Sequence, residues 1–295
     1  MISYKGPIIV IAGPTASGKS SLAIQIAKKI NGYILNADSR QIYKELKIGT
    51  AQPTPEIIEN DVWYIDNVKH YLYGQIAAQN NYNLFQYQKD VQKVLNKESG
   101  IPILVGGTGL YIDSIVHNYN LKKSNINMRK KLEAMSVSKL HSLIDKESLE
   151  KMNSSDIKNP IRLIRVIERG SIDKQKGEKL NYLYLLLDPN QDNLKGNISK
   201  RVDQMFENGL LEENQLLLEL GLTYQNRALQ SIGYQEFKDF FNKKISIKET
   251  KDNIILHTLQ YAKRQKTWFR RNNDVIKIKG FKDAYDSISN FLIIS

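Results

Sequence analysis

Residues 8–20 of this 295-residue chain read Ile-Ile-Val-Ile-Ala-Gly-Pro-Thr-Ala-Ser-Gly-Lys-Ser. The short β-branched run at the start of this stretch predicts a buried strand, which we place at residues 7–11. The last eight residues, 13–20, fit the pattern G-x-x-x-x-G-K-[ST], and residues 20–30 have the apolar spacing of a helix. The order strand, glycine-rich loop and helix predicts a loop that binds phosphate groups, although an empty glycine-rich turn has the same pattern.

Each residue type in this loop has a physical reason. Gly13 and Gly18 permit backbone angles that are closed to other residues, so that amide N–H groups converge on phosphate oxygens. The N-terminus of the following helix adds a partial positive charge, Lys19 adds a full one, and the hydroxyl of Ser20 can be a ligand of Mg²⁺. The predicted diphosphate-binding residues are Gly13, Pro14, Thr15, Ala16, Ser17, Gly18, Lys19 and Ser20, with Ser20 as the metal ligand.

The rest of the chain alternates between predicted strands and helices. Strands are predicted at residues 33–37, 101–105, 182–187 and 275–278, and helices at 82–95, 198–220 and 254–271, with a loop near 224–233. This alternation is typical of a parallel α/β sheet.

Residues 117–180 have a different character. They show helical periods, many Lys, Asn and Ser residues, and no convincing strand. Within them, Asn159 as N-cap and Pro160 at the first helical position begin a helix that Gly170 ends. We therefore predict an α/β fold with a P-loop NTPase-like parallel sheet core, residues 1–116 and 181–295, and a mostly helical insertion at 117–180.

Composition and charge limit the class of protein. The absence of cysteine excludes disulfides, thiolate-bound metals and thiol catalysis, and the four histidines have no metal-ligand spacing. No apolar run approaches the ~20 residues of a membrane span, and the N-terminus does not resemble a signal peptide, so we expect a cytoplasmic protein without membrane contact. The net charge of +12 divides into +2 for residues 1–116 and +10 for residues 117–295. Solubility alone does not explain this division, which favours a polyanionic partner such as nucleic acid.

A carboxylate follows the second predicted strand. Kinases and ATPases hold Mg²⁺ with an acid at the end of a buried strand, but residues 101–105 are followed by Gly-Gly-Thr. Asp38 follows the strand at 33–37 instead, where a simple turn residue is the alternative. Because open α/β sheets bind ligands at the carboxyl ends of their strands, Asp38 is predicted to face the phosphate loop.

Seven short motifs occur in an order that resembles a known family. They are GPTASGKS (13–20), DSRQIY (38–43), GTAQP (49–53), GGTGLY (106–111), PIRLIR (160–165), SIGYQE (231–236) and KRQKTWFR (263–270). Over nearly the whole chain they look like the bacterial tRNA dimethylallyltransferases, also called tRNA isopentenyltransferases. The resemblance implies transfer of a dimethylallyl group from dimethylallyl diphosphate to N6 of the adenine on the 3′ side of the anticodon. It also implies that the helical insertion at 117–180 binds the anticodon stem-loop of tRNA. We expect a monomer with Mg²⁺ as cofactor.

The resemblance implies roles for single residues. Asp38 is the expected general base, Lys19 is expected to stabilise the leaving diphosphate, and Thr108 lies at the reacting centre or caps the following helix. Arg129 is expected to contact tRNA or diphosphate, or to be a solvated charge. The expected tRNA-binding residues are Asp38, Ser39, Arg40, Gln41, Thr108, Arg129, Ile161, Arg162, Leu163, Ile164, Arg165, Lys263, Arg264 and Arg270.

Tyrosines and arginines supply further candidates. Tyr43, Tyr111 and Tyr234 are candidate walls of a pocket for the flipped adenine, or ordinary half-buried tyrosines. Arg162, Arg165 and Arg169 fall on one helix face, which favours phosphate contacts over a solvated face.

Three alternative functions stay open at this stage. An adenylate prenyltransferase has less need of the basic second part, a small-molecule P-loop kinase leaves that part unexplained, and a non-catalytic RNA-binding protein leaves the phosphate loop unexplained. The sequence departs from the family at Gln191 and Gln235, where a basic residue is frequent.

Overall fold

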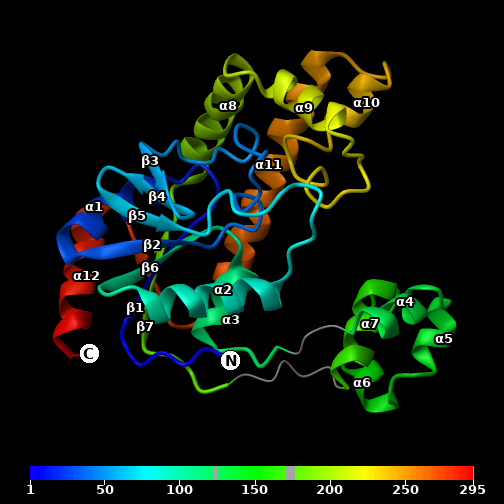
Figure 1. The fold of residues 1–295 in the computed structure, drawn as a ribbon, viewed down its shortest axis with the longest axis horizontal. Helices are drawn as coiled ribbons and strands as arrows, with labels where there is room; N and C mark the ends of the chain where they lie inside the picture. The colour runs from blue at the N-terminus through cyan, green and yellow to red at the C-terminus, as the bar shows by residue number, and fades with distance from the viewer. Residues whose placement is uncertain (122–124, 171–176, 295) are drawn as a thin grey trace. The chain divides into compact units, whose positions relative to one another are not determined.

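The computed structural model describes residues 1–121, 125–170 and 177–294 (Figure 1). Contacts between residues divide the chain into two compact units. The smaller unit, which we call the insertion, comprises His117–Lys179 together with Met1; the larger unit, which we call the core, comprises Ile2–Val116 and Leu180–Ser295.

The core contains one sheet of eight strands within the described residues, in the order β3-β4-β5-β2-β6-β1-β7-β8. Neighbours from β5 to β8 run parallel, and β3, β4 and β5 are antiparallel. The five strands predicted from the sequence are confirmed as β1, β2, β6, β7 and β8, whereas β3–β5 were not predicted. The bounds are β1 Ile8–Ala12, β2 Gly32–Asn36, β3 Ile57–Glu59, β4 Val62–Ile65, β5 Val68–Tyr71, β6 Ile101–Gly106, β7 Tyr182–Leu187 and β8 Val275–Ile278.

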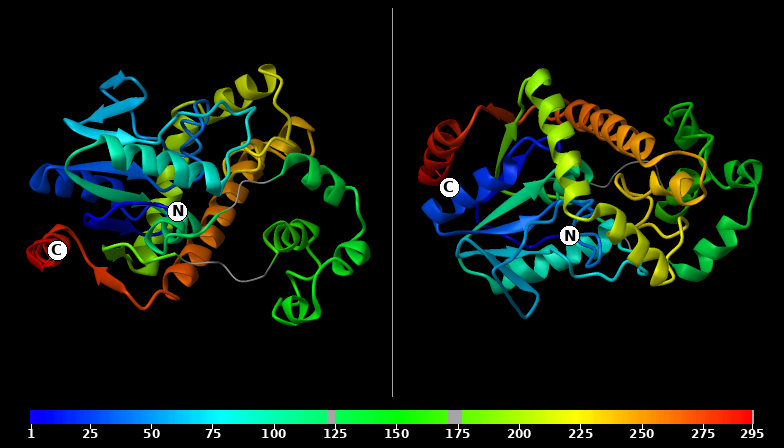
Figure 2. Two further views of the ribbon diagram at one scale, coloured as in Figure 1. Left: turned by 60° about the horizontal axis from the view of Figure 1, so that its bottom comes forward. Right: turned by 90° about the horizontal axis from the view of Figure 1, so that it is seen from above.

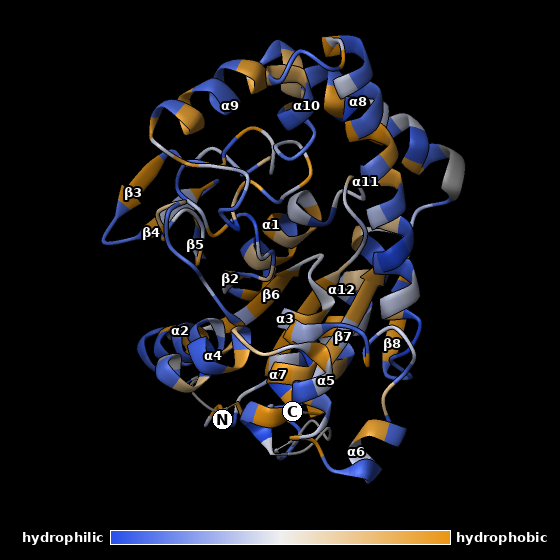
Figure 3. Ribbon diagram, turned by 90° about the vertical axis from the view of Figure 1, so that its right-hand side faces the viewer, coloured by the Kyte–Doolittle hydropathy of each residue, from blue (hydrophilic) through white to orange (hydrophobic). Residues whose placement is uncertain are grey.

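Helices cover both faces of the sheet (Figure 2). On one face, α1 (Lys19–Ile30) and α12 (Phe281–Ile294) pack against Ile9, Ile11 and Ile103. On the other, α2 (Leu84–Lys97) and α3 (Gly109–Val116) pack against Val10 and Leu104. The central strands β1, β2, β6 and β7 are almost wholly buried, as expected for a parallel sheet. Strands β6 and β7 are coloured as hydrophobic in Figure 3. The α/β fold class is therefore confirmed.

The helices after β7 differ in part from those predicted. The segment predicted as one helix at 198–220 forms α8 (Gln191–Glu207) and α9 (Leu210–Glu219), because Gly209 adopts φ 93° between them. The basic helix predicted at 254–271 begins earlier, as α11 (Ile247–Phe269), because Ser246 and Glu249 form a capping box. The short α10 (Phe237–Phe241) and the C-terminal α12 were not predicted.

The insertion contains α4 (Ile126–Glu133), α5 (Val137–His141), α6 (Lys146–Glu150) and α7 (Pro160–Arg169). Asn159 caps α7 and Gly170 ends it with φ 76°, as predicted. The insertion has its own small apolar core. The core chain stops at Val116 and resumes at Leu180, whose backbone N–H donates to the Val116 carbonyl at 3.2 Å.

None of the helices in the described ranges has the length and apolar character needed to cross a membrane.

Candidate active site at the carboxyl ends of the strands

Three loops meet where β1, β2 and β6 end. Strand β6 lies between the other two in the sheet, so the loops that follow them are neighbours. The N–H of Ala37 donates to Val105 O at 2.7 Å, and the N–H of Thr108 donates to Ala37 O at 3.1 Å. Backbone hydrogen bonds therefore bring the loop of Asp38 against that of Thr108, beside the phosphate-loop sequence after β1.

The two loop glycines are required for different reasons. Gly18 adopts φ 86°, which a side chain rarely permits, as predicted. Gly13 is needed for space, since a Cβ there would lie 2.7 Å from the carbonyl oxygen of Leu187. The hydroxyl of Ser17 is buried and has no hydrogen-bond partner within the described part of the chain. An anion bound by the loop would supply the acceptor that this hydroxyl lacks.

Two cations and one carboxylate occupy the space beside the loop. Burial lowers the pKa of Lys19 to about 8, against the opposing effect of Asp38 and with a further lowering by Arg201. Burial also lowers the pKa of Arg201, and Asp38 again opposes it. Two half-buried cations with one carboxylate leave the site electropositive, which suits an anionic ligand.

Arg201 was missed by the sequence analysis. It projects from α8, and its Nη1 donates to the Thr15 hydroxyl at 2.8 Å while its Nη2 donates to Thr50 O at 3.2 Å. It therefore joins the phosphate loop to the GTAQP segment, residues 49–53. Nothing in the sequence separates it from the neighbouring Lys195 and Lys200, which are exposed.

Asp38 is held in a tight turn. One carboxylate oxygen accepts the Arg40 N–H at 2.9 Å, and its own N–H donates to Asn36 Oδ1 at 2.8 Å. The other carboxylate oxygen has no hydrogen bond among the residues that the structure describes. This arrangement fixes the side chain and leaves one oxygen to accept a proton or a hydrogen bond from a ligand.

Thr108 uses two groups for two purposes. Its hydroxyl oxygen accepts the Ser39 N–H at 3.0 Å, and its carbonyl accepts the N–H groups of Tyr111 and Ile112 in the first turn of α3. The backbone of Thr108 thus begins the helix, while its side chain is turned toward the loop of Asp38.

Helix α11 reaches into the same site with two residues that the sequence analysis missed. Gln265 Oε1 accepts the Thr15 N–H at 2.9 Å, and Gln265 Nε2 donates to Gly107 O at 2.9 Å. Burial raises the pKa of Tyr261 to about 12, with a smaller rise from Asp38 and a lowering by hydrogen bonds with Thr108 and Gln265. Gln265 lies within the KRQKTWFR motif, but an uncharged amide gives no signal of a site.

Glu213 holds the segment before the GTAQP motif. Its carboxylate accepts the N–H groups of Lys47, Ile48 and Gly49 and the hydroxyl of Tyr234 at 2.7 Å. Tyr234 and Tyr43 are therefore core residues, and Tyr111 is also buried, stacked on Tyr87. Tyr111 lies near Asp38. Burial is the largest cause of its raised pKa, and Tyr43 and Asp38 raise that pKa further.

The RNA-binding candidates of the core fall into two sets. Lys263 and Arg264 are exposed on α11, and Arg270 is exposed at the C-cap of this helix, whereas Gln265 is buried. Ser39, Arg40 and Gln41 are half-buried: Arg40 donates to Arg227 O at 2.8 Å, and Gln41 donates to the carbonyls of Thr50 and Ala51.

The structure corrects two candidates in the insertion. Leu163 and Ile164 are 0% and 2% exposed and form the core of the insertion, so their side chains are not available to RNA. On the same helix, Ile161 is exposed, Arg162 pairs with Asp156, and Arg165 is half-buried. Arg129 pairs with Glu133 at 3.0 Å and Glu168 at 3.2 Å, so it is neither a free solvated charge nor fully buried.

The described residues contain no cluster of three or more His, Cys, Asp or Glu side chains that is arranged to hold a metal ion. Ser20 is exposed in the first turn of α1. Within the described ranges, these donors therefore do not form a closed metal cage.

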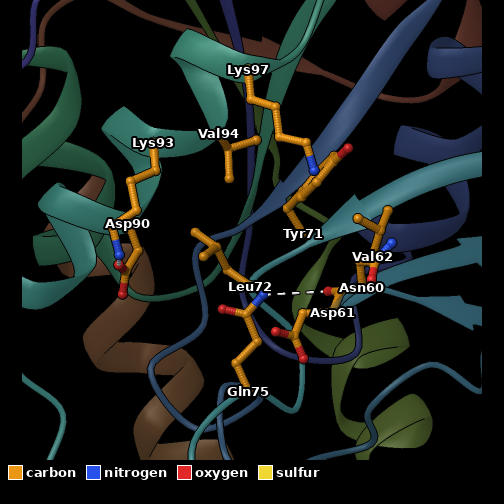
Figure 4. A pocket seen from close by; sticks show the side chains of 10 residues that line it. All are labelled: Asn60, Asp61, Val62, Tyr71, Leu72, Gln75, Asp90, Lys93, Val94 and Lys97. Atoms are coloured by element: carbon orange, nitrogen blue, oxygen red, sulfur yellow. Dashed lines mark hydrogen bonds and ion pairs between the residues drawn. The ribbon is translucent and has the colours of Figure 1, made fainter.

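A separate pocket lies between α2 and the β4–β5 hairpin (Figure 4). It contains none of the candidate site residues, and its lining mixes both signs of charge, with the amide of Gln75 bonded to Asp61 O at 3.4 Å. We assign no role to this pocket, whose lining residues are Asn60, Asp61, Val62, Tyr71, Leu72, Gln75, Asp90, Lys93, Val94 and Lys97.

Fold and site together define an α/β protein with a glycine-rich phosphate-binding sequence next to a carboxylate. Residues 41–272 match the family model described as IPP transferase. The chain belongs to this family, which confirms the resemblance predicted from its motifs.

Individual relatives agree with the family model. The chain is 39% identical over 282 residues to a protein of Microcystis aeruginosa named tRNA dimethylallyltransferase, covering 91% of this chain and 86% of the relative. A crystal structure of the tRNA isopentenylpyrophosphate transferase from Bacillus halodurans is 29% identical, with a TM-score of 0.73 over 98% of both chains. A eukaryotic dimethylallyltransferase described as acting on tRNA is 23% identical and shares the fold, with a TM-score of 0.80 over 98% of this chain and 80% of that one.

Proposed function

We propose that this protein transfers a dimethylallyl group from dimethylallyl diphosphate to N6 of the adenine on the 3′ side of the anticodon in tRNA. The observation that carries the proposal is the placement of Asp38 and Thr108 beside a phosphate loop with Lys19 and Arg201, in a member of the IPP transferase family. The names of the relatives support the same activity.

The cationic side of the site suits the leaving group. As the bond between C1 of the allyl group and oxygen breaks, its electron pair stays on diphosphate, where negative charge grows. Lys19, Arg201 and the amides of the loop are placed to stabilise that charge. The allyl carbon tolerates partial positive charge, so an interaction that loosens the leaving group speeds the reaction.

The carboxylate side suits the acceptor. The N6 amine of adenine is a weak nucleophile, because its lone pair is delocalised into the ring. As N6 forms its bond to C1, it must lose a proton, and the uncommitted oxygen of Asp38 is placed to accept it. Thr108, anchored to Ser39, holds the loop of Asp38 against the diphosphate site.

Mg²⁺ fits this site as a partner of the substrate. The ion usually binds through one or two protein oxygens together with substrate phosphates and water, which agrees with the hydroxyl of Ser20 and with the lack of a closed cage in the described residues. When bound, Mg²⁺ would neutralise negative charge on the departing diphosphate.

The charge of the chain supports a large polyanionic acceptor. The net charge is +10 for residues 117–295, and Lys263 and Arg264 on α11 and Arg270 at its C-cap are exposed. Together with Arg162 and Arg165 of the insertion, these residues are the proposed contacts with tRNA phosphates. The proposal includes a cytoplasmic monomer. An adenylate prenyltransferase is the second candidate function. It ranks second because an adenylate acceptor would leave the exposed basic face of α11 without a partner.

One assay separates the candidates. The protein is incubated with labelled dimethylallyl diphosphate, Mg²⁺ and one of three acceptors: tRNA that lacks the modification, AMP or ATP. We expect label in tRNA alone, at the adenine next to the anticodon. Label in AMP and none in tRNA would favour the adenylate prenyltransferase, and phosphate release from ATP without label transfer would favour a kinase.

A further inference from the structure

The buried amide of Gln265 connects the phosphate loop after β1 with the loop of Gly107 and Thr108 after β6. We propose that Gln265 is a positioning residue, which fixes the phosphate loop relative to Thr108 and so sets the distance between the leaving diphosphate and the acceptor. This inference rests on the proposed function for its kinetic consequence, but its structural content stands without it.

The two hydrogen bonds of Gln265 lie beyond the ends of the paired strands β1 and β6. Strands β1 and β6 are paired up to Ala12 and Gly106, and beyond that pair the sheet supplies no register. Gln265 acts beyond it, with Oε1 on the Thr15 N–H and Nε2 on the Gly107 carbonyl, both at 2.9 Å. The residue is 4% exposed, so water does not replace these bonds readily.

A continuous series of contacts runs from Gln265 to the proposed base. Gly107 precedes Thr108, whose hydroxyl accepts the N–H of Ser39, the residue next to Asp38. In the other direction, Thr15 is held on both sides, by Gln265 at its N–H and by Arg201 at its hydroxyl. Gln265 therefore contacts both the phosphate loop and the loop of Gly107 and Thr108, and it belongs to neither loop.

The fit around the amide is close. A Cβ on Gly107 would lie 2.1 Å from Nε2 of Gln265, so this glycine leaves the space that the amide fills. Loss of the amide would leave the carbonyl of Gly107 unpaired at a buried position and the N–H of Thr15 unpaired at a part-buried one. The loops would then relax, and a displacement of about 1 Å between reacting groups is enough to lower a rate by about 10²-fold.

The test compares two variants that disturb the amide with one that disturbs a similar residue elsewhere. Gln265→Met removes both bonds at similar volume, and Gly107→Ala displaces the amide without changing it. The control is Gln88→Met, since Gln88 is also 4% exposed and donates to a backbone carbonyl, that of Ser114 at 3.1 Å, between α2 and α3.

We expect both site variants to lower kcat for tRNA prenylation by ~10–100-fold, with the Kd of inorganic diphosphate changed by less than about threefold. Gln265→Met should add little to Thr108→Val, because the two act through one series of contacts. The control should lower Tm and leave kcat unchanged. An unchanged kcat in Gln265→Met, or an equal loss in the control, would overturn the proposal.

Hydrogen–deuterium exchange tests the same contact without activity. We expect residues 13–20 and 105–109 to exchange faster in Gln265→Met and not in Gln88→Met; equal exchange would overturn the proposal. If the wild-type protein transfers no label to tRNA, the proposed function fails, and exchange alone then decides the role of Gln265.

Discussion

The hydroxyl oxygen of Thr108 accepts a hydrogen bond of 3.0 Å from the backbone N–H of Ser39. This bond holds the loop after β6 against the loop after β2, so that the position of Asp38 depends on a side chain 70 residues further along the chain.

Replacing Thr108 tests this relationship. Thr108→Val keeps the shape and removes the acceptor of the Ser39 N–H, which costs ~1–3 kcal/mol and should lower kcat by ~10–100-fold. Thr108→Ser keeps the hydroxyl and should keep most of the activity. Steady-state kinetics with tRNA measure both, and equal activity of the two variants would show that the hydroxyl has no part in positioning.

Asp38→Asn tests the proposed base. The amide keeps an oxygen for the Arg40 N–H, so the turn survives, but the side chain no longer accepts a proton. We expect turnover to fall by ~10²–10⁴-fold, the usual contribution of a general base, while tRNA binds as before. A parallel loss of tRNA affinity in a filter-binding assay would assign Asp38 to adenine binding instead.

Arg201→Met tests the second cation of the site. The guanidinium makes charge-assisted bonds to Thr15 and Thr50, and its charge lies near the proposed diphosphate. Loss of such a contact costs ~1.5–3 kcal/mol, so the KM for dimethylallyl diphosphate should rise by ~10–100-fold. Lys200→Met, on the neighbouring exposed position of α8, is the matched control and should behave as wild type.

The exposed basic face of α11 predicts a salt effect. The affinity for tRNA should fall steeply with salt concentration, since each neutralised phosphate releases counterions. Lys263→Ala and Arg264→Ala should each lower the slope of log K against log salt by about 1. Lys248→Ala, exposed on the same helix ~22 Å away, is the control. A slope that none of these changes would place RNA on another face.

Glu213 makes a prediction for stability. Its carboxylate accepts three backbone N–H groups and the Tyr234 hydroxyl, so Glu213→Gln should lower the free energy of unfolding by ~1–3 kcal/mol. Glu212→Gln removes the same charge from the same helix turn at an exposed position and should have little effect. Denaturant unfolding of both variants measures the difference, and equal destabilisation would mean that the charge, not the contacts, matters.

The sequence predicted the five strands β1, β2, β6, β7 and β8 because most of their residues are apolar. It missed β3–β5, which are only three or four residues long and of which β3 and β5 each contain a charged residue. Asn60-Asp61 and Asp66-Asn67 nevertheless adopt positive φ at the tight turns between these strands. Such Asn and Asp pairs are a hairpin signal, and they were available in the sequence.

Only some residues of the candidate site could be predicted from the sequence. Lys19 and Asp38 could be found because one belongs to a loop pattern and the other follows a strand. Arg201 and Gln265 could not, since their importance depends on which side of a long helix faces the loops. Leu163 and Ile164 were misassigned because a motif does not distinguish residues that contact a ligand from those that support the helix.

The core chain stops at Val116 and resumes at Leu180, and a single backbone hydrogen bond of 3.2 Å joins these two residues. The two ends of the segment His117–Lys179 therefore lie next to each other, as the ends of a long surface loop do. The order of the strands in the core does not depend on this segment. Lengthening such a loop costs little conformational entropy, because the cost grows only with the logarithm of its length. Evolution can thus remodel this segment, by insertion, deletion or exchange, while the chemistry of the sheet edge stays the same.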